Sequence, residues 1–292
     1  MSRITIVTDS NSGILQAEGK ELGVTVIPMP FTINMDEFFE ELSITQDEFY
    51  DYLAKGVDVT TSQPSEYYLE ELWEGLLQNY DELVYIPMTS GLSKTCENAM
   101  RYAERFDGKV QVVDNKRISV TLKESVLEAI QLAKEGKSAK EIKEILEADK
   151  GKANIYIMMG VLKYLKKGGR ISPTAATVAE ALRIKPILWS KGDNFEKFAL
   201  AMSVGQAKKK MINQLIHDLE TEFKQEYENG QVCISLAHTQ NFAEAQKFKE
   251  EIIKNIPNVP VHFVDPLSLS VSCHIGPGAL ACTVTKTSRN NK

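Results

Sequence analysis

Hydroxyl side chains gather in three short stretches of the sequence, each beside a segment with the pattern of a strand or a helix. These stretches cover residues 8–13, 60–65 and 89–95. Serine and threonine hydroxyls, together with backbone N–H groups, donate hydrogen bonds that bind carboxylates and phosphates. In a parallel sheet, such groups meet beyond the carboxyl ends of the strands, where helices begin. The three stretches therefore predict an anion-binding edge.

Helix capping is the competing interpretation of the same residues. Serine, threonine and aspartate are preferred at helix N-caps, and Pro64 suits a first helical turn. Capping alone does not predict several hydroxyls within each stretch. We therefore keep both interpretations, with an anion site as the functional one.

A fourth candidate is the segment from Cys273 to Ala279, in which His274 precedes Gly276-Pro277-Gly278. A lone histidine is more often structural than functional. Beside the exposed backbone amides of a glycine-rich turn, however, an imidazole can contact an anion.

Familiar catalytic motifs are missing from the sequence. Gly91 and the pair Lys94-Thr95 do not have the spacing of a nucleotide-binding P-loop, and there is no H-E-x-x-H, G-x-S-x-G or EF-hand pattern. The four histidines are too scattered to predict a metal site, and we expect no metal or cofactor. An enzyme of phosphoryl transfer or hydrolysis, using the serine-rich loops and the Lys167–Arg170 turn, stays open as the alternative to a non-catalytic binding protein.

Composition narrows the class of protein. The chain has 292 residues, of which 43% are hydrophobic and 25% charged, as in an ordinary globular protein. Its net charge of -6 argues against a nucleic-acid partner, which needs a dense positive surface. The lysine clusters at 166–167 and 208–210 are typical of a solvated helix face.

Targeting signals and disulfides are not expected either. The apolar run near the N-terminus is too short for a signal peptide, and no run approaches the roughly 18 apolar residues of a membrane span. The four cysteines are widely spaced without a C-x-x-C pair, which predicts reduced, mostly packed thiols. We expect a cytoplasmic protein without stable membrane insertion.

The first half of the chain alternates β-branched runs with helical patterns, which predicts repeated β-α units in a three-layer sandwich with a mainly parallel sheet. The expected strands are 4–8, 24–27, 83–86 and 110–113, and the expected helices are 14–22, 66–77, 95–105, 119–134 and 139–150. The acidic segment Met35–Glu41, with its two phenylalanines, is interpreted as a solvated loop.

The second half has a mixed pattern, which predicts a smaller α+β domain. We expect strands at 155–159, 185–190, 195–201 and 232–237, and a final strand pair at 261–264 and 280–285. The turn residues 191–194 predict a hairpin. Helices are expected at 161–167, 174–182, 206–227 and 242–253. We place the boundary near residue 160, giving an α/β domain at 1–160 and a mixed domain at 161–292.

Six segments, in order along nearly the whole chain, resemble the signature segments of the DegV family. They are Thr8-Asp9-Ser10-Asn11-Ser12, Thr61-Ser62-Gln63-Pro64-Ser65, Ser90-Gly91-Leu92-Ser93, Lys167-Gly168-Gly169-Arg170-Ile171-Ser172, Ile184-Lys185-Pro186-Ile187 and His274-Ile275-Gly276-Pro277-Gly278-Ala279. Each is a weak signal alone, but six in the family's order are specific.

The resemblance implies a non-catalytic protein that binds a long-chain fatty acid, such as palmitate or oleate, between its two domains. Family members resemble the carrier subunits that present acyl chains to a fatty-acid kinase, so lipid transport and a kinase subunit as partner are implied. Carried onto this chain, the carboxylate ligands are Ser62 and Ser93, with Thr61 and His274 beside them. Backbone amides near Lys94 and Gly276 complete the set, and Arg170 lies near the mouth.

The sequence departs from the family pattern at two places. Lys94 replaces a usual glycine and Cys96 a common aromatic residue, so the head-group loop is expected to differ in shape. The run Ala201–Val204 lacks the arginine that many carriers have in a segment linked to kinase contact. This departure weakens the kinase expectation more than the lipid-binding one.

Overall fold

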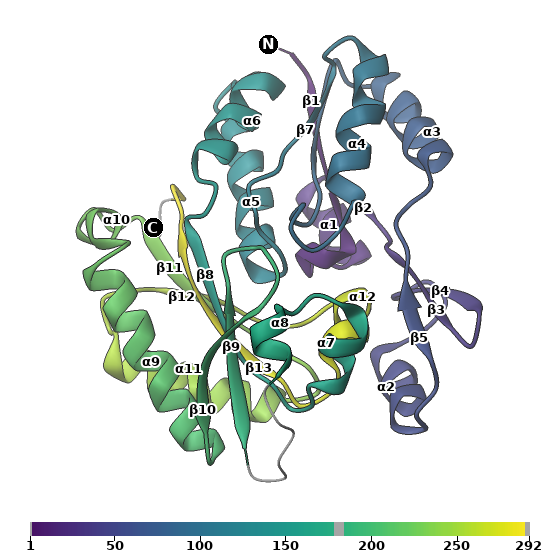
Figure 1. Cartoon of the computed structure of the whole chain (residues 1–292). Coiled ribbons are helices and arrows are strands. Elements are labelled where there is room, and N and C mark those ends of the chain that lie inside the picture. Colours follow the sequence, from purple (N-terminus) through teal and green to yellow (C-terminus); the bar gives the residue numbers. More distant parts are fainter. Residues whose placement is uncertain (1, 178–183, 290–292) are drawn as a thin grey trace. The chain divides into compact units, whose positions relative to one another are not determined.

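The computed structural model describes residues 2–177 and 184–289, which form two compact units (Figure 1). Unit 1 contains the chain up to Lys150 together with the segment Ser268–Ser270. Unit 2 contains Gly151–Leu267 and the chain from Val271 onward. The division comes after Lys150 rather than near residue 160, because the strand that follows has its ladder partners in unit 2.

A four-stranded parallel sheet is the centre of unit 1. Its strands are β1 (Ile4–Asp9), β2 (Val24–Ile27), β6 (Glu82–Ile86) and β7 (Val110–Val112), in the order β2-β1-β6-β7. The strands are rich in valine and isoleucine and nearly all buried, as expected when helices cover both faces.

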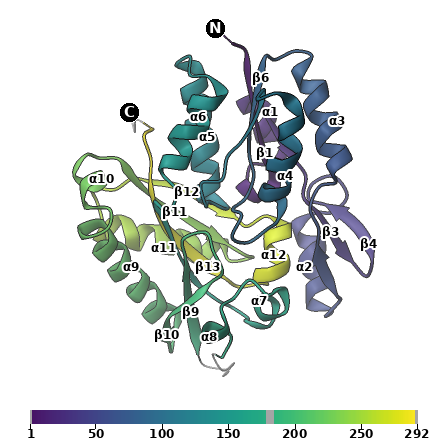
Figure 2. The ribbon, with the colours of Figure 1, turned by 45° about the horizontal axis from the view of Figure 1, so that its top comes forward.

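Helices cover the two faces of this sheet (Figures 1 and 2). One apolar cluster joins the sheet to α1 (Gln16–Leu22), α5 (Val120–Lys134) and α6 (Ala139–Ala148). A second cluster on the opposite face joins it to α3 (Glu66–Leu77) and α4 (Thr95–Ala103), around the fully buried Trp73. The predicted three-layer sandwich is confirmed.

A small antiparallel sheet, which the sequence did not predict, lies between β2 and α3 in the chain. It has the order β4-β3-β5 and comprises β3 (Pro30–Ile33), β4 (Asp36–Phe39) and β5 (Val59–Thr61). Helix α2 (Gln46–Ala54) lies between β4 and β5 in the chain and packs on the sheet through the rings of Phe49 and Phe31. The interpretation of Met35–Glu41 as a solvated loop is wrong, because β4 pairs with β3 and the ring of Phe38 stacks 6.4 Å from that of Phe31. Glu40, the residue directly after β4, is buried.

Unit 2 contains a mixed six-stranded sheet in the order β10-β9-β8-β13-β11-β12. The strands are β8 (Ala153–Met158), β9 (Lys185–Ser190), β10 (Glu196–Ala201), β11 (Val232–His238), β12 (Val261–Pro266) and β13 (Leu280–Lys286). The β9-β10 hairpin is confirmed. The expected pairing of the last two strands is wrong: both pair with β11, β12 in parallel and β13 antiparallel.

Three helices pack against the apolar core of unit 2: α9 (Val204–Glu220), α10 (Lys224–Glu228) and α11 (Phe242–Asn255). The single helix expected at 206–227 is broken near Thr221, where the chain turns and the Phe223 side chain becomes fully buried. The short helices α7 (Lys163–Gly168) and α8 (Pro173–Ala176) belong to unit 2, whereas α12 (Leu269–Ile275) begins with residues of unit 1 and ends in unit 2. The helix expected at 174–182 extends beyond the described residues.

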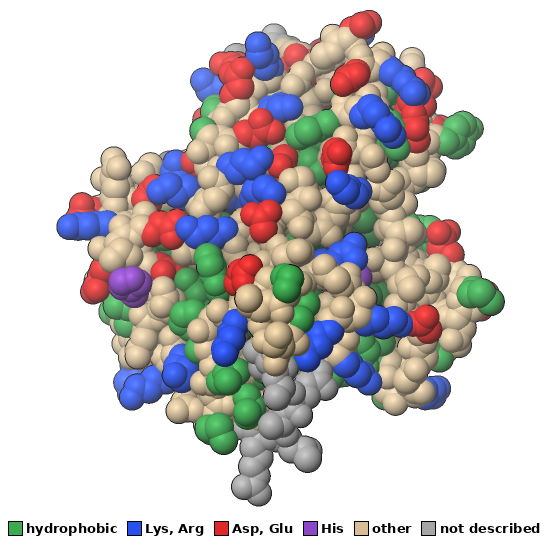
Figure 3. Space-filling model, viewed as in Figure 1, with side chains coloured by type: hydrophobic (Ala, Val, Ile, Leu, Met, Phe, Trp, Pro, Cys, Tyr) green, Lys and Arg blue, Asp and Glu red, His purple; other side chains and the backbone are tan. Residues whose placement is uncertain are grey.

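On the face drawn in Figure 3, cationic and anionic side chains are interspersed. Surface ion pairs such as Lys137–Glu141 fit this mixture. No helix in the described part of the chain combines the length and the apolar character that crossing a membrane requires.

Candidate functional site

The parallel sheet of unit 1 has its topological switch point between β1 and β6. From β1 the chain passes to β2 on one side, and from β6 it passes to β7 on the other, so the loops after β1 and β6 flank the crevice where open sheets bind ligands. The Asp9 carboxylate joins these two loops by accepting hydrogen bonds from the amides of Asn11 and Met88, each at 3.0 Å. Complete burial raises the pKa of Asp9 to about 6.

The hydroxyls of the first predicted stretch are used inside unit 1. Thr8 donates to the carbonyl of Ile86 at 2.8 Å, Ser12 donates to the carbonyl of Asp9 at 2.9 Å, and the Ser10 hydroxyl accepts from the amide of Met29. Because these groups have protein partners, the capping and loop-shaping interpretation holds for residues 8–13.

The loop after β6 presents Ser93 at the start of α4. Its Oγ accepts from the amide of Thr95 at 3.2 Å and lies 2.8 Å from Thr95 Oγ1, where either hydroxyl can be the donor. When Thr95 donates, the Ser93 proton can point to a ligand. A serine just before the N-terminus of a helix can thus bind an anion.

Lys94, the next residue, has an exposed side chain that pairs with Glu97 at 2.8 Å on the same helix. Its backbone amide makes no hydrogen bond to the protein within residues 2–177 and 184–289. The side chain is therefore directed to solvent, and the amide is the part of Lys94 that can bind an anion.

Thr61 and Ser62 lie at and just beyond the end of β5. Thr61 pairs with Phe31 in the small sheet, and the amide of Ser62 donates to the carbonyl of Pro30 at 3.2 Å. The Ser62 side chain is exposed, and its hydroxyl has no hydrogen-bond partner in the described part of the protein. This hydroxyl can therefore serve a ligand.

Two side chains that sequence reasoning did not select shape this region. Gln63 accepts a hydrogen bond at 2.9 Å from Asn98, one turn into α4, which joins the Ser62 loop to the helix that follows Ser93. Asp114, after β7, accepts from the hydroxyl of Ser90 and from Lys150, each at 2.8 Å. Burial opposes ionisation, but these hydrogen bonds outweigh it and lower the pKa of Asp114. Nothing in the local sequence distinguishes either residue from a surface polar residue.

In unit 2, His274 lies near the end of α12. Burial, with a smaller effect of the nearby Arg170 charge, lowers the pKa of His274 to about 4, so the imidazole is neutral at pH 7. The guanidinium of Arg170 donates to the carbonyl of Gly168. The structure therefore brings together the histidine and the arginine that the sequence selected.

Two glycines let the loop after β8 approach the His274 segment closely. A methyl group on Gly168 would lie 2.1 Å from Nδ1 of His274, and one on Gly276 would lie 2.2 Å from Cδ2 of Tyr164. Gly276 also has a φ of 72°, which favours glycine. The signature glycines are thus required by packing around the imidazole.

The backbone donors of the glycine-proline-glycine turn are occupied within unit 2. The amide of Gly276 donates to the carbonyl of Ser272 at 2.8 Å, and that of Gly278 to the carbonyl of Thr239 at 2.9 Å. The Gly276 amide, for which a ligand role was expected, is therefore already bonded within the protein.

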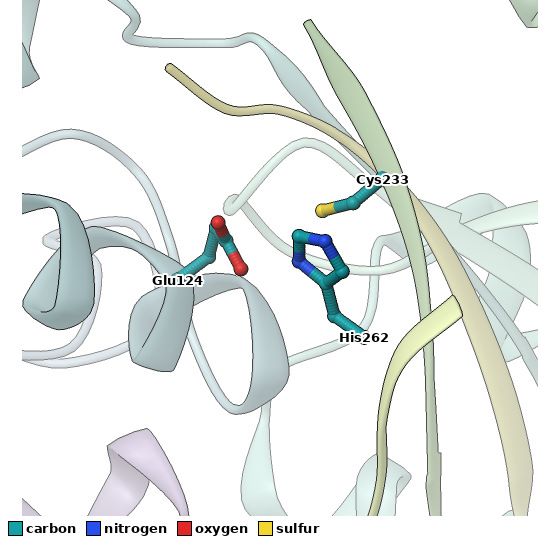
Figure 4. A group of neighbouring side chains, drawn as sticks. All are labelled: Glu124, Cys233 and His262. Carbon is teal, nitrogen blue, oxygen red and sulfur yellow. The ribbon is translucent and has the colours of Figure 1, made fainter. Parts of the chain in front are cut away.

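Cys233 and His262 lie on the neighbouring strands β11 and β12 (Figure 4). They give unit 2 two side chains that a metal ion could bind at this place, fewer than the three or four protein ligands of a zinc site. Glu124, drawn in the same figure, belongs to α5 of unit 1 and is buried.

The chain matches known proteins over nearly its whole length. A family model described as "Uncharacterised protein, DegV family" matches residues 3–287. A DegV domain-containing protein of Staphylococcus aureus (strain N315) is 29% identical over 291 residues, covering 98% of this chain and 100% of that protein.

Solved structures agree in fold. A Thermus thermophilus DegV family protein, described by its fatty acid binding, has a TM-score of 0.84 and 25% identity and covers 97% of this chain and 99% of its own. DegV of Bacillus subtilis, described as a fatty acid binding protein, has a TM-score of 0.83 and 26% identity, with 98% and 100% covered. These likenesses support the two-domain α/β fold. Because one family model spans almost the entire sequence, the chain belongs to the DegV family.

Proposed function

We propose that this protein binds one long-chain fatty acid, such as palmitate or oleate, and that binding rather than catalysis is its function. The observation that carries the proposal is the exposed Ser62 hydroxyl, which has no partner among the described residues and lies in the loop joined to α4, the helix that follows Ser93, in a chain similar to two fatty-acid-binding proteins. The ligand carboxylate accepts hydrogen bonds from Ser62, Ser93 and the amide of Lys94, with Thr61 next to them.

The imidazole of His274, in unit 2, is the remaining donor of the proposed carboxylate site. His274 is neutral at pH 7 and donates one N–H, which does not require protonation. Arg170 adds positive charge near the mouth of the binding site without contacting the carboxylate directly.

The acyl tail and the head group have different energetic roles. A tail of about fourteen methylenes contributes on the order of 10 kcal/mol when buried, at about 0.8 kcal/mol each, before the cost of association. A hydrogen bond to a carboxylate contributes about 1.5–3 kcal/mol. The tail therefore determines affinity, and the hydroxyl and imidazole donors select the acid over an uncharged lipid.

Alanine variants of delipidated protein test the carboxylate site. We expect Ser62→Ala and Ser93→Ala together to weaken palmitate binding at least tenfold, measured by calorimetry, and to affect hexadecanol much less. Ser65→Ala is the matched control, because Ser65 caps α3 by accepting from the amide of Tyr68 at 3.1 Å. It should lower stability by about 1 kcal/mol and leave palmitate affinity unchanged. Unchanged palmitate affinity in the double variant would remove both serines from the site.

We further propose that the loaded protein presents its acyl chain to a fatty-acid kinase. The family resemblance supports this role, whereas the run Ala201–Val204 lacks the arginine typical of many carriers. Incubation of the palmitate-loaded protein with a bacterial fatty-acid kinase subunit and ATP should yield acyl phosphate. Absence of product, with a known carrier active in parallel, would restrict the function to binding.

A further inference from the structure

Glu40 is a buried carboxylate in an otherwise largely exposed acidic segment. Only 7% of the residue is exposed, whereas Glu37 and Glu41 face solvent. Its Oε1 accepts from Nε2 of Gln46 at 3.0 Å, and its Oε2 accepts from the backbone amide of Leu269 at 2.8 Å. Burial is costly for a carboxylate, so these two hydrogen bonds must compensate for the loss of water.

The Leu269 amide is the first donor of α12, and the residues around it belong to unit 1. A second contact holds the same place: Oδ1 of Asn11 accepts from Ser270 at 2.5 Å and from Ser268 at 3.4 Å. Asn11 and Glu40 thus both contact the segment Ser268–Ser270.

The Glu40 contact replaces the cap that the local sequence would supply. Ser268 stands directly before α12, where a serine normally accepts from an amide of the first turn. Its hydroxyl is instead directed to Asn11, and the helix receives a carboxylate from residue 40, which is 229 positions away in the chain. The position of α12 therefore depends on the segment that follows β4.

His274 lies five residues after Leu269 in this seven-residue helix, about 7.5 Å along its axis. We propose that Glu40 is a positioning residue for ligand binding: by holding the start of α12, it sets the position of the His274 imidazole. The inference rests on the proposed function, in which His274 donates to the fatty-acid carboxylate.

A double-mutant cycle tests this role. Glu40→Met fills the space but removes both acceptor oxygens. Glu40→Gln keeps one oxygen, which can accept from the Leu269 amide, and its NH2 group can donate to the side-chain oxygen of Gln46 when the Gln46 amide is turned over. We expect Glu40→Met to weaken palmitate binding about tenfold and Glu40→Gln to bind nearly as the parent does. Glu37→Met, on the exposed part of the same segment, is the control and should bind palmitate normally.

The same substitutions are then made together with His274→Ala. If Glu40 acts through His274, Glu40→Met weakens binding no further in that background. The inference would be overturned if Glu40→Met weakened palmitate binding by as much in the His274→Ala background as in the parent. It would also be overturned if Glu40→Met left the palmitate affinity of the parent unchanged. Should Glu40→Met not fold, Glu40→Asp, which withdraws the oxygens by one methylene, must show the same dependence on His274. If His274→Ala alone binds palmitate normally, the proposed carboxylate site fails instead, and the inference falls with it.

Discussion

The buried carboxyl of Asp9 should make unit 1 less stable as the pH rises through the weakly acidic range. Its pKa is about 6 in the folded protein, against a reference value of 3.8. Between these values the folded unit retains a proton that the unfolded chain has released, so the free energy of unfolding falls with rising pH. The contribution is fully present below pH 3.8 and is lost by about pH 7.

The magnitude follows from the difference between the two pKa values. A difference of about two units, at 1.36 kcal/mol per unit, corresponds to about 3 kcal/mol. Asp9→Asn cannot ionise and should lack this slope. Because asparagine has one acceptor oxygen where Asp9 has two, the variant also loses a hydrogen bond, so the comparison is between slopes rather than absolute stabilities.

The two tryptophans allow the measurement to be confined to unit 1. Trp73 is buried in unit 1 and Trp189 lies on β9 in unit 2, so in a Trp189→Phe background the fluorescence reports unit 1 alone. Urea unfolding from pH 5 to 7.5, with and without Asp9→Asn, gives the two slopes, and carbon NMR of the Asp9 carboxyl gives its pKa directly. Equal slopes, or a carboxyl that titrates near pH 4, would refute the reasoning.

Two further predictions concern unit 2. Gly168→Ala should weaken palmitate binding at least tenfold, because its methyl group would displace the His274 imidazole. Gly169→Ala is the control: its methyl group meets open space but φ is 69°, so it should lower the stability by about 1 kcal/mol and leave palmitate affinity intact. Equal affinities of the two variants would contradict this. Asp218→Ala should destabilise unit 2 by about 3 kcal/mol or more, because Asp218 is buried and accepts from the Tyr156 hydroxyl at 2.8 Å. Tryptophan fluorescence of unit 2 in urea measures this loss, and a shift below 1 kcal/mol would contradict it.

The sequence predicted the helices and strands whose apolar residues recur at a regular spacing along the chain. The strand Val24–Ile27 and the helix Glu66–Leu77 were predicted with the bounds that the structure shows, because each combines a periodic apolar face with a clear turn or cap. The break near Thr221 had no such signal, because neither glycine nor proline marks it. There the burial of Phe223 in the core overrides the helical pattern.

Contacts between residues that are distant in the chain could not be predicted from the sequence. The pattern showed that 261–264 and 280–285 are strands, but not that β11 separates them. For the site, residue types and family order selected Ser62, Ser93 and His274. The sequence could not show that the Ser62 hydroxyl lacks a partner among the described residues while the hydroxyls of residues 8–13 are occupied, since that depends on which backbone groups the fold brings near.

The return of Ser268–Ser270 to unit 1 has a consequence for the order of events during synthesis. Unit 1 can collapse once Lys150 has left the ribosome, but Oδ1 of Asn11 and Oε2 of Glu40 receive these donors only when residues 268–270 emerge. At roughly 5–20 residues per second, this is a delay on the order of 10 s. During that interval the nascent unit lacks a segment of its own chain, and it becomes complete only after residues 268–270 have been synthesised.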